Sequence, residues 1–553
     1  MANINEVRIP EELLLSVRKP ARYIGCEINS ITKDWDKARV RFCLCFPDLY
    51  EIGMSNLGIK ILYHILNRQE SILCERCFTP WIDMEKVLRD NSIPLFSLEN
   101  KMPLKYFDIL GFSFSYELSY TNMLTMLDLS GIPFLSAQRK NGAYPLIIAG
   151  GSCVVNPEPL SEFVDIFVIG DGEDAAVEIA NAYDKYNSDK SLILRHLSQI
   201  EGVYVPAVRS PAAKVVKRVT RTLEKADFPT KPIVAYIEPV HDRITVEIMR
   251  GCPNNCYFCQ ARSVYGPVRL RDKGQIRDLA KESYRNTGLD EVSLLSLSSA
   301  SYPGIEGLIT ELTSMFLPLG VGISLPSLRI EESTLNIPSL VSAVKKSGLT
   351  FAPEAATDRM LKKINKNIEK EKLFAVLKQA FSRGWRRVKL YFMIGLPDET
   401  DEDVRGIIDF ARAIDSLRRE VSPRPVDIVV SVSSFIPKPH TFFQRQAMAD
   451  PSELLRKQAM LLSASKKTKC LKLKFSDVNT SVLEAVFSRG DKGLGRIIRS
   501  AWEQGARFDA WSETFNPAIW DKAFEICGID KKRYLGRKDN DEALPWSHIV
   551  TGH

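Results

Sequence analysis

The sequence lacks the features of a membrane protein. It contains no run that approaches the roughly 18 apolar residues of a membrane span. Its first residues, MANINEVRIPEELL, are too acidic and too short in apolar character for a signal peptide. A strong charge excess is also missing, because a net charge of +7 over 553 residues is only mildly basic and does not by itself indicate a nucleic-acid partner. We therefore expect a cytoplasmic protein with no membrane association.

Cysteine usage argues against a disulfide framework. The chain has eleven cysteines, an odd number, and three of them lie close together in one loop. This pattern favours a reducing compartment. The length corresponds to about three domains. Hydrophobic residues at 45% and charged residues at 26% are ordinary for a globular protein.

The three neighbouring cysteines are Cys252, Cys256 and Cys259, which follow a short β-like run in residues 245–266, TVEIMRGCPNNCYFCQARSVYG. Three thiolates at this spacing on a tight loop can hold three corners of a [4Fe-4S] cluster and leave the fourth iron without a protein ligand. A closed zinc site would need a fourth Cys or His, and after Cys259 neither occurs before His440. Structural zinc and ordinary core cysteines remain the alternatives.

This CxxxCxxC motif after a strand, with Phe258 before the last cysteine, resembles the radical S-adenosylmethionine (SAM) superfamily. In that family SAM chelates the open iron, and reductive cleavage yields a 5′-deoxyadenosyl radical. The resemblance therefore implies two cofactors, a [4Fe-4S] cluster and S-adenosyl-L-methionine. It also implies an external electron donor such as flavodoxin or ferredoxin.

Residues 38–185, after a lead-in at 1–37, alternate strand-like and helix-like segments and predict a Rossmann-like open sheet. Gly150-Gly151 and the GDGE turn at 170–173 fall at predicted strand ends. They would either line a cofactor-facing rim of the sheet or simply form turns that need small residues. No GxGxxG is present, so a nicotinamide cofactor is not supported. The region is similar to the cobalamin-binding domains that precede some radical SAM cores.

The axial-histidine signature of such domains, D-x-H-x-x-G, is missing. His64 has Leu62 two residues before it and Asn67 three residues after it, so we interpret it as a helix-surface or core residue. Two alternatives remain open for this domain. It binds cobalamin without a protein ligand to the metal, or it has kept the fold and lost the cofactor. Cys74 and Cys77 form a CxxC pair, which we interpret as buried thiols, with a second metal site as the alternative.

The remaining chain divides into a connector at 186–240, a barrel at 241–445 and a mostly helical unit at 446–553. Residues 241–445 contain six strand candidates, which fit the partial (βα)6 TIM-type barrel of radical SAM enzymes. In the last unit, LKLKF at 471–475 alternates apolar and lysine residues, as in a strand with one face in the core. Its lysines would make phosphate contacts or form a solvated edge.

The resemblance implies SAM contacts at the carboxyl ends of the barrel strands, where barrel active sites lie. The usual Gly-Gly-Glu is absent after the second strand, so hydroxyl or backbone acceptors would have to replace it. Glu354, which ends the fourth strand, is placed to accept from ribose or from the SAM amine. The expected contacts are Ser298, Ser299, Ser327, Arg329, Glu354, Gly395 and Pro397.

No catalytic acid or base can be assigned from the sequence. His440, in FIPKPHTFFQ, would rim the substrate mouth together with Lys438 and could act as an acid or base, but no partner for it is visible.

Longer segments, among them FPDLYEIGMSNLG and FAPEAATDRMLKKINKN, resemble one uncharacterised family of radical SAM proteins with an N-terminal cobalamin-binding-like domain. The resemblance implies an enzyme that cleaves SAM and modifies an unactivated carbon, by methyl transfer to RNA or protein if cobalamin is present. Radical rearrangement or sulfur insertion without cobalamin is the alternative within this class. A non-catalytic iron-sulfur redox or regulatory protein is the alternative outside it.

Overall fold

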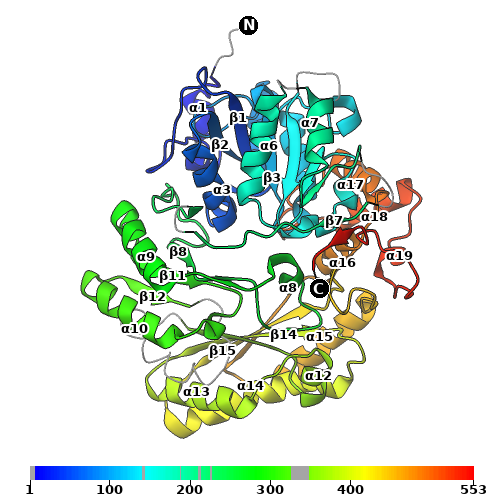
Figure 1. Ribbon diagram of the computed structural model, residues 1–553. Helices are drawn as coiled ribbons and strands as arrows, with labels where there is room; N and C mark the ends of the chain where they lie inside the picture. Colours follow the sequence, from blue (N-terminus) through cyan, green and yellow to red (C-terminus); the bar gives the residue numbers. More distant parts are fainter. Residues whose placement is uncertain are drawn as a thin grey trace.

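A computed structural model describes residues 6–139, 144–186, 189–208, 213–224, 227–325, 348–466 and 468–552. Figure 1 shows an N-terminal sheet with its helices above two further sheets, and the C-terminal helices alongside both. The predicted mixed α/β fold with parallel sheets is confirmed. No helix within the described ranges is long and apolar enough to cross a bilayer.

The N-terminal sheet has six strands in the order β2-β1-β3-β4-β5-β6. The first five are parallel, and β6 joins antiparallel to β5. This order places a topological switch point between β1 and β3, where open α/β sheets bind ligands. The strands are β1 (Val40–Phe46), β2 (Ile72–Phe78), β3 (Ile109–Ser113), β4 (Leu146–Gly150), β5 (Ile166–Val168) and β6 (Val203–Tyr204).

Helices cover both faces of this sheet, which explains why its strands are apolar without alternation. One face packs against α3 (Leu57–Arg68), α6 (Glu173–Lys185) and α7 (Lys190–Leu197). The other packs against α4 (Ile82–Asp90) and α5 (Tyr120–Leu129). Two short helices, α1 (Glu11–Leu15) and α2 (Tyr50–Gly53), complete this part.

The six strands predicted after residue 241 all form, in two parallel sheets. The first sheet holds β8 (Ile244–Glu247), β11 (Glu291–Leu295) and β12 (Gly322–Ser324). The second holds β13 (Leu349–Glu354), β14 (Arg387–Ile394), β15 (Asp427–Ser434) and also β16 (Leu471–Phe475). β16 falls within the mostly helical unit predicted at 446–553, but it pairs in parallel with β15.

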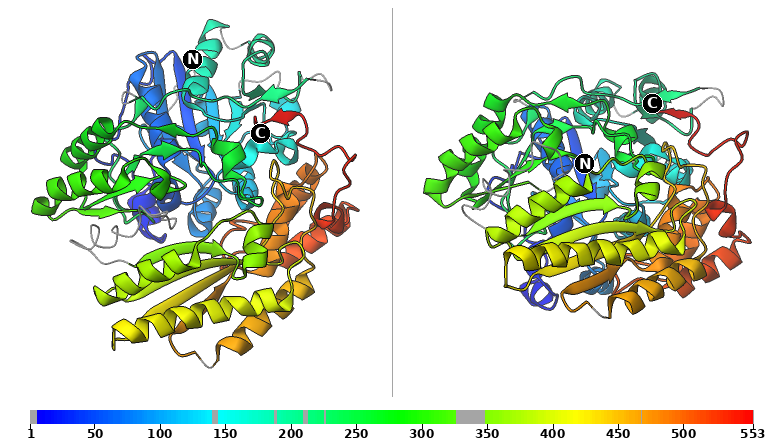
Figure 2. Two further views of the ribbon diagram at one scale, coloured as in Figure 1. Left: turned by 60° about the horizontal axis from the view of Figure 1, so that its bottom comes forward. Right: turned by 90° about the horizontal axis from the view of Figure 1, so that it is seen from below.

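Helices pack on one side of each of these sheets. Figure 2 shows this for the yellow and green helices of the second sheet. Those of the first sheet are α9 (Lys273–Thr287) and α10 (Ile305–Phe316). Those of the second sheet are α13 (Lys370–Ser382), α14 (Asp401–Val421) and α15 (Pro451–Ser465). The short helix α12 (Asp358–Lys363) packs in a separate cluster against the cysteine loop.

The C-terminal helices share a hydrophobic core with the N-terminal sheet. Trp520 is buried in this core, while Trp502 contacts Phe134 of the N-terminal part. The elements are α16 (Val478–Ser488), α17 (Leu494–Glu503), α18 (Pro517–Ile526), α19 (Lys532–Leu535) and β17 (Ile549–Val550), which pairs with β7 (Val215–Val216). The domain boundaries themselves stay a prediction.

A buried ion network fastens the lead-in segment to the N-terminal sheet. The Arg76 guanidinium on β2 lies 2.7 Å from Glu27 Oε2 and 2.6 Å from Glu99 Oε1, and both carboxylates are fully buried. Burial opposes the charge of Glu27, but Arg76 holds its pKa below the usual range. We predict that Arg76→Met lowers the free energy of unfolding by about 3–5 kcal/mol, because it leaves two buried carboxylates without their cation.

Urea denaturation followed by circular dichroism measures this change. The matched control is Lys86→Met, which breaks the exposed Lys86–Asp90 pair and should cost about 0.5 kcal/mol or less. Equal midpoints for the two variants would contradict the prediction.

Candidate active site

The cysteine loop starts where β8 ends and is led in by β9 (Met249–Arg250), which pairs with β10 (Arg269–Leu270). Gly251 has φ +86°, and a Cβ there would lie 2.6 Å from the Pro267 carbonyl oxygen. Only glycine fits this turn without strain. The loop then carries Cys252, Cys256 and Cys259 and ends in α8 (Ala261–Tyr265).

The three cysteines are partly exposed and close enough to influence one another. Burial raises the pKa of the Cys259 thiol, and Cys256 and Cys252 raise it further. No set of three His, Cys, Asp or Glu side chains within the described ranges is arranged around a single metal ion. A cubic cluster does not need such a set, since each of its cysteines binds a different iron. The loop thus fits a cluster held at three corners.

Neighbouring loops clamp the cysteine loop through hydrogen bonds. The Tyr257 amide donates to the Ile364 carbonyl (3.0 Å), and the Asn365 side chain donates to the Asn255 carbonyl (2.7 Å). On the other side, the Phe443 amide donates to the Tyr257 carbonyl (3.1 Å). The loop is therefore held between the segment that follows β13 and the segment that follows β15.

The predicted serines after β11 meet this loop. Asn254 Nδ2 lies 3.4 Å from Cys252 Sγ and 3.4 Å from Ser298 Oγ, so it joins a cysteine to the end of the neighbouring strand. Ser299 Oγ pairs with Ser296 Oγ at 3.0 Å and is buried. Hydroxyl groups thus stand where the resemblance implies contacts to the SAM amine.

Glu354 has an unusual backbone at the end of β13. Its φ is +69°, next to an irregularity in the pairing with β14. Such strain in a non-glycine residue is characteristic of functional sites. Its carboxylate lies 3.4 Å from Lys366 Nζ, with 18% of the side chain exposed. Burial raises the pKa of Glu354, and Lys366 partly offsets this.

Gly395 and Pro397 follow β14 as expected, but the Gly395 amide is already engaged. It donates to Glu399 Oε2 at 2.7 Å, and the same carboxylate pairs with Lys457. Backbone contact with adenine would therefore have to use other groups of this segment. Ser327 and Arg329 lie outside the described residues.

The segment after β15 contacts the N-terminal part of the chain through Lys438 and His440. Lys438 pairs with Glu117 (2.7 Å) and Glu484 (2.8 Å), and His440 Nε2 lies 3.0 Å from the Val155 carbonyl oxygen. Burial lowers the pKa of His440 to about 4. These side chains join the segment after β15 to the N-terminal part and to α16, which does not favour an acid or base role for His440.

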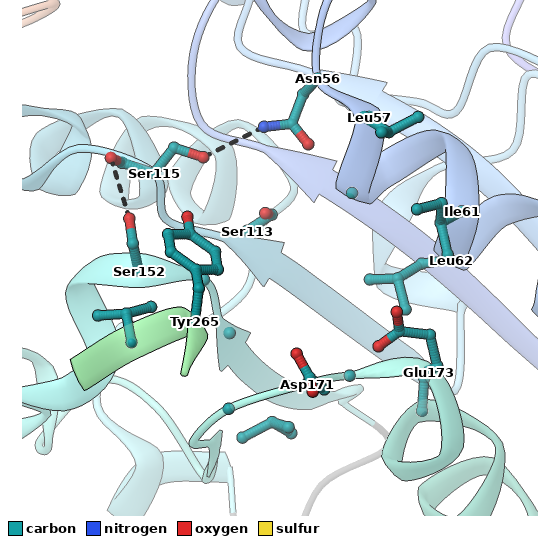
Figure 3. A pocket seen from close by; sticks show the side chains of 18 of the residues that line it. Asn56, Leu57, Ile61, Leu62, Ser113, Ser115, Ser152, Asp171, Glu173 and Tyr265 are labelled. Carbon is teal, nitrogen blue, oxygen red and sulfur yellow. Dashed lines mark hydrogen bonds between the residues drawn. The ribbon is translucent and has the colours of Figure 1, made fainter. Parts of the chain in front are cut away.

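A pocket of about 450 Å³ separates the N-terminal sheet from the cysteine loop. It opens at the switch point between β1 and β3, and Gly150, Gly151 and the GDGE turn line it, as the rim interpretation predicts. Figure 3 shows one end with neutral polar side chains and another with acidic ones. The neutral group is Asn56, Ser113, Ser115, Ser152 and Tyr265, and the acidic pair is Asp171 and Glu173.

No histidine is found among the described residues that line this pocket. His64 lies on α3, outside the lining, in agreement with its interpretation as an ordinary helix residue. Sequence reasoning missed Asn56 and Tyr265, because neither belongs to a recognisable motif. The position of Tyr265 directly after the cysteine loop was the one available signal.

Arg250 connects this pocket to the cysteine loop, and sequence reasoning missed it too. Its guanidinium lies 3.0 Å from Asp171 Oδ1, 2.6 Å from Glu173 Oε1 and 2.9 Å from Glu247 Oε1. Arg269 also pairs with Asp171. All these side chains are at least seven-eighths buried. The residue that starts the cysteine loop is thus anchored to the sheet that forms the other wall of the pocket.

Family comparisons agree with this arrangement. Residues 246–411 match the radical SAM superfamily, and residues 58–206 match the N-terminal domain of radical SAM proteins. The chain belongs to the radical SAM superfamily. It is accordingly an enzyme, and the predicted combination of a radical SAM core with an N-terminal sheet domain is confirmed.

Among relatives of this radical SAM protein, the uncharacterized protein MJ0966 of Methanocaldococcus jannaschii is 28% identical over 456 residues, 82% of this chain and 90% of that protein. The ribosomal protein uS12 methylthiotransferase RimO of Pelotomaculum thermopropionicum is 24% identical over 39% of this chain. The chain spans 52% of that relative's length. Its similarity to the methylthiotransferase is therefore partial.

Two solved structures share the fold at 14% identity. TsrM, a radical SAM methyltransferase from Kitasatospora setae with cobalamin and [4Fe-4S] cluster bound, has a TM-score of 0.53 over 88% of this chain and 100% of that one. OxsB, a cobalamin-dependent radical SAM enzyme, has a TM-score of 0.50 over 90% of this chain and 71% of that one.

Protonation of His440 should destabilise the fold. Its pKa is about 4 in the folded protein and about 6.5 when unfolded, so between these values the unfolded state binds the proton and the folded state does not. Stability is therefore lost as the pH falls from about 6.5 to about 4. We predict that His440→Gln removes about 2 kcal/mol of this pH dependence, allowing for the partial exposure of the ring.

Thermal denaturation at a series of pH values measures the effect. His196→Gln, on the exposed surface of α7, is the matched control and should keep the pH dependence of the wild type. A pH profile of His440→Gln that coincides with that of the control would contradict the prediction.

Proposed function

We propose that this protein cleaves S-adenosylmethionine at a [4Fe-4S] cluster and uses cobalamin to methylate an unactivated carbon of an RNA or protein substrate. The observation that carries the proposal is the pocket at the sheet's switch point, which faces the cysteine loop and is joined to it by Arg250. An external donor such as flavodoxin or ferredoxin would supply electrons. All eleven cysteines are free of disulfides, which supports a reducing compartment, and we propose the cytoplasm.

Cys252, Cys256 and Cys259 would hold three irons, and Asn254 would orient the loop toward Ser298. When bound, the cluster and SAM supply the electron and the radical precursor. The chain's own residues position and shield these groups. The proposed SAM contacts are Ser298, Ser299, Ser327, Arg329, Glu354, Gly395 and Pro397.

The pocket residues fit a corrin better than a small polar ligand. A corrin is a large apolar ring with neutral amide side chains, and the pocket combines apolar walls such as Leu62 and Ile148 with neutral hydrogen-bonding groups at one end. Because the described lining contains no histidine, we propose that cobalamin binds without an imidazole ligand. TsrM and OxsB, which share the fold, bear cobalamin according to their structures, and this supports the proposal.

Sulfur insertion, the activity class of the partly similar methylthiotransferase, has less support. Such an activity would favour a second cluster, but Cys74 and Cys77 belong to cores on opposite faces of the N-terminal sheet. They do not converge on one metal. Burial raises the pKa of both thiols well above the ordinary value, which disfavours the thiolate needed for metal binding.

Anaerobic reconstitution tests the radical chemistry. With SAM and a strong reductant, we expect the wild type to form 5′-deoxyadenosine, detected by mass spectrometry, and S-adenosylhomocysteine if methyl transfer occurs. Cys256→Ala should lose most cluster absorbance and abolish both products. The control Cys470→Ala, on a cysteine outside the loop, should retain them. An intact, cluster-loaded wild type that forms neither product would favour the non-catalytic iron-sulfur alternative.

Filling the pocket tests cobalamin binding separately. A Cβ on Gly150 would have its nearest neighbour 4.0 Å away, so a larger side chain can project into the pocket without backbone strain. We predict that Gly150→Leu, purified from cobalamin-fed cells, loses at least nine-tenths of the wild-type corrin absorbance, as an order-of-magnitude estimate for a steric block. Its cluster absorbance should remain.

Gly307→Leu is the matched control, because Gly307 lies exposed on α10 with open space around it. It should bind cobalamin like the wild type. If Gly150→Leu binds cobalamin at the wild-type level, the pocket is not the cobalamin site.

A further inference from the structure

The four-stranded sheet β13–β16 has one apolar and one polar face. Residues 387–392 of β14 alternate, with Val388, Leu390 and Phe392 buried in the core beneath the helices. On β16, the leucines and Phe475 pack against the same core. The opposite side of the sheet, which we call the inner face, carries Arg387, Lys389, Tyr391, Val429, Ser431, Lys472 and Lys474.

Strand register arranges the inner face in rows. Lys389 on β14 is aligned with Val429 on β15, which is aligned with Lys472 on β16. In the next row, Tyr391 is aligned with Ser431, and Ser431 with Lys474. Neighbouring strands lie about 4.8 Å apart, so the lysines of the first row are about 10 Å apart across the sheet. Cations thus flank a strip of small uncharged residues.

On β14–β16, the inner face carries more cations than carboxylates. Arg387, Lys389, Lys472 and Lys474 contribute four cations, whereas Asp427, paired with Lys472 at 2.9 Å, is the acidic residue of the same face on β15. Arg387, Lys474 and Tyr391 are exposed, and Lys472 has 63% of its side chain exposed. Full barrels fill this position with bulky apolar side chains, so a cationic inner face is not explained by packing.

The inner face leads to the candidate active site. On β14, the inner-face position after Tyr391 is Met393, which is buried in a cluster with Phe435 and Phe443. Tyr257 and Phe258 of the cysteine loop pack against this same cluster. The inner face therefore runs along β14 from the exposed cations to Met393 at the carboxyl end of the strand. There it meets the loop that carries the cysteines.

We propose that the inner face binds the phosphate backbone of a single-stranded RNA segment and so directs a nucleotide toward the cysteine loop. This inference rests on the proposed function and selects RNA from its two substrate classes. Single-stranded nucleic acids are bound by cations that follow the backbone and by an aromatic ring that stacks on a base. Tyr391 provides the ring, and Lys389 Nζ lies 4.5 Å from its centroid.

A labelled single-stranded RNA of about twelve nucleotides and mixed sequence is a suitable probe, since such sites span about 4–16 nucleotides. Binding to the full-length, cluster-loaded protein is measured by fluorescence anisotropy at several salt concentrations. For Lys389→Gln/Lys472→Gln/Lys474→Gln, we expect about tenfold or greater weakening and a salt slope reduced by about 2, because each phosphate contact contributes about 0.7.

The matched control is Lys86→Gln/Lys105→Gln/Lys281→Gln, which removes the same charge from exposed positions elsewhere. It should keep the wild-type salt slope. At Tyr391, replacement by Leu should weaken binding about tenfold, while Tyr391→Phe, which retains the ring, should bind like the wild type. Circular dichroism and iron content confirm that each variant is folded and loaded.

Two outcomes would overturn the proposal. The first is equal weakening by the inner-face and control triple variants. The second is a wild type that does not bind the RNA at low salt. Formation of 5′-deoxyadenosine is measured on the same wild-type preparation, so failure of RNA binding is distinguished from failure of the radical chemistry.

Discussion

The structure depends on the buried ion network around Arg250. This side chain holds three carboxylates at once: Asp171 in the turn before α6, Glu173 at the start of α6 and Glu247 at the end of β8. Buried charges are tolerated only when they are paired, and removal of one partner costs about 3–5 kcal/mol. The network therefore fixes the separation between the N-terminal sheet and the start of the cysteine loop. The pocket owes its shape to this constraint.

Further contacts make the junction rigid on its other side. Lys438 joins the segment after β15 to Glu117 and Glu484, and His440 contacts the backbone of the N-terminal part. The C-terminal helices share a core with the N-terminal sheet, so these two parts form one packed unit. Chemistry that passes between two cofactors needs a fixed distance, and fixed reactive groups lower the entropic part of a barrier.

Local patterns predicted the elements of this fold well. The apolar runs of the N-terminal strands, the six later strands and the cysteine loop all follow from residue type and spacing. Long-range partners could not be predicted in the same way. The alternation at 471–475 indicates a half-buried strand, but nothing local reveals that β15 is its neighbour.

The site shows the same division between local and distant information. Glu354 is a predicted contact because it ends a strand, and its positive φ is a feature that the sequence could not reveal. His440 lies in a segment that resembles a substrate rim, yet its ring is occupied by the Val155 carbonyl from a distant part of the chain. The amide of Gly395 is likewise occupied by Glu399. Sequence motifs locate a segment, while competing hydrogen-bond partners decide which of its groups remain available.

A polar inner face has a consequence for how the reaction is protected. Reactive intermediates must be shielded from water and from side reactions. In the proposed enzyme, the N-terminal sheet and the cysteine loop shield the pocket side, but the inner face of β13–β16 carries exposed lysines and Tyr391 instead of a packed core. Burying those cations against an apolar lid would be costly. A polyanion neutralises them as it covers them, so a bound RNA segment would itself close the site on this side and couple radical formation to the presence of substrate.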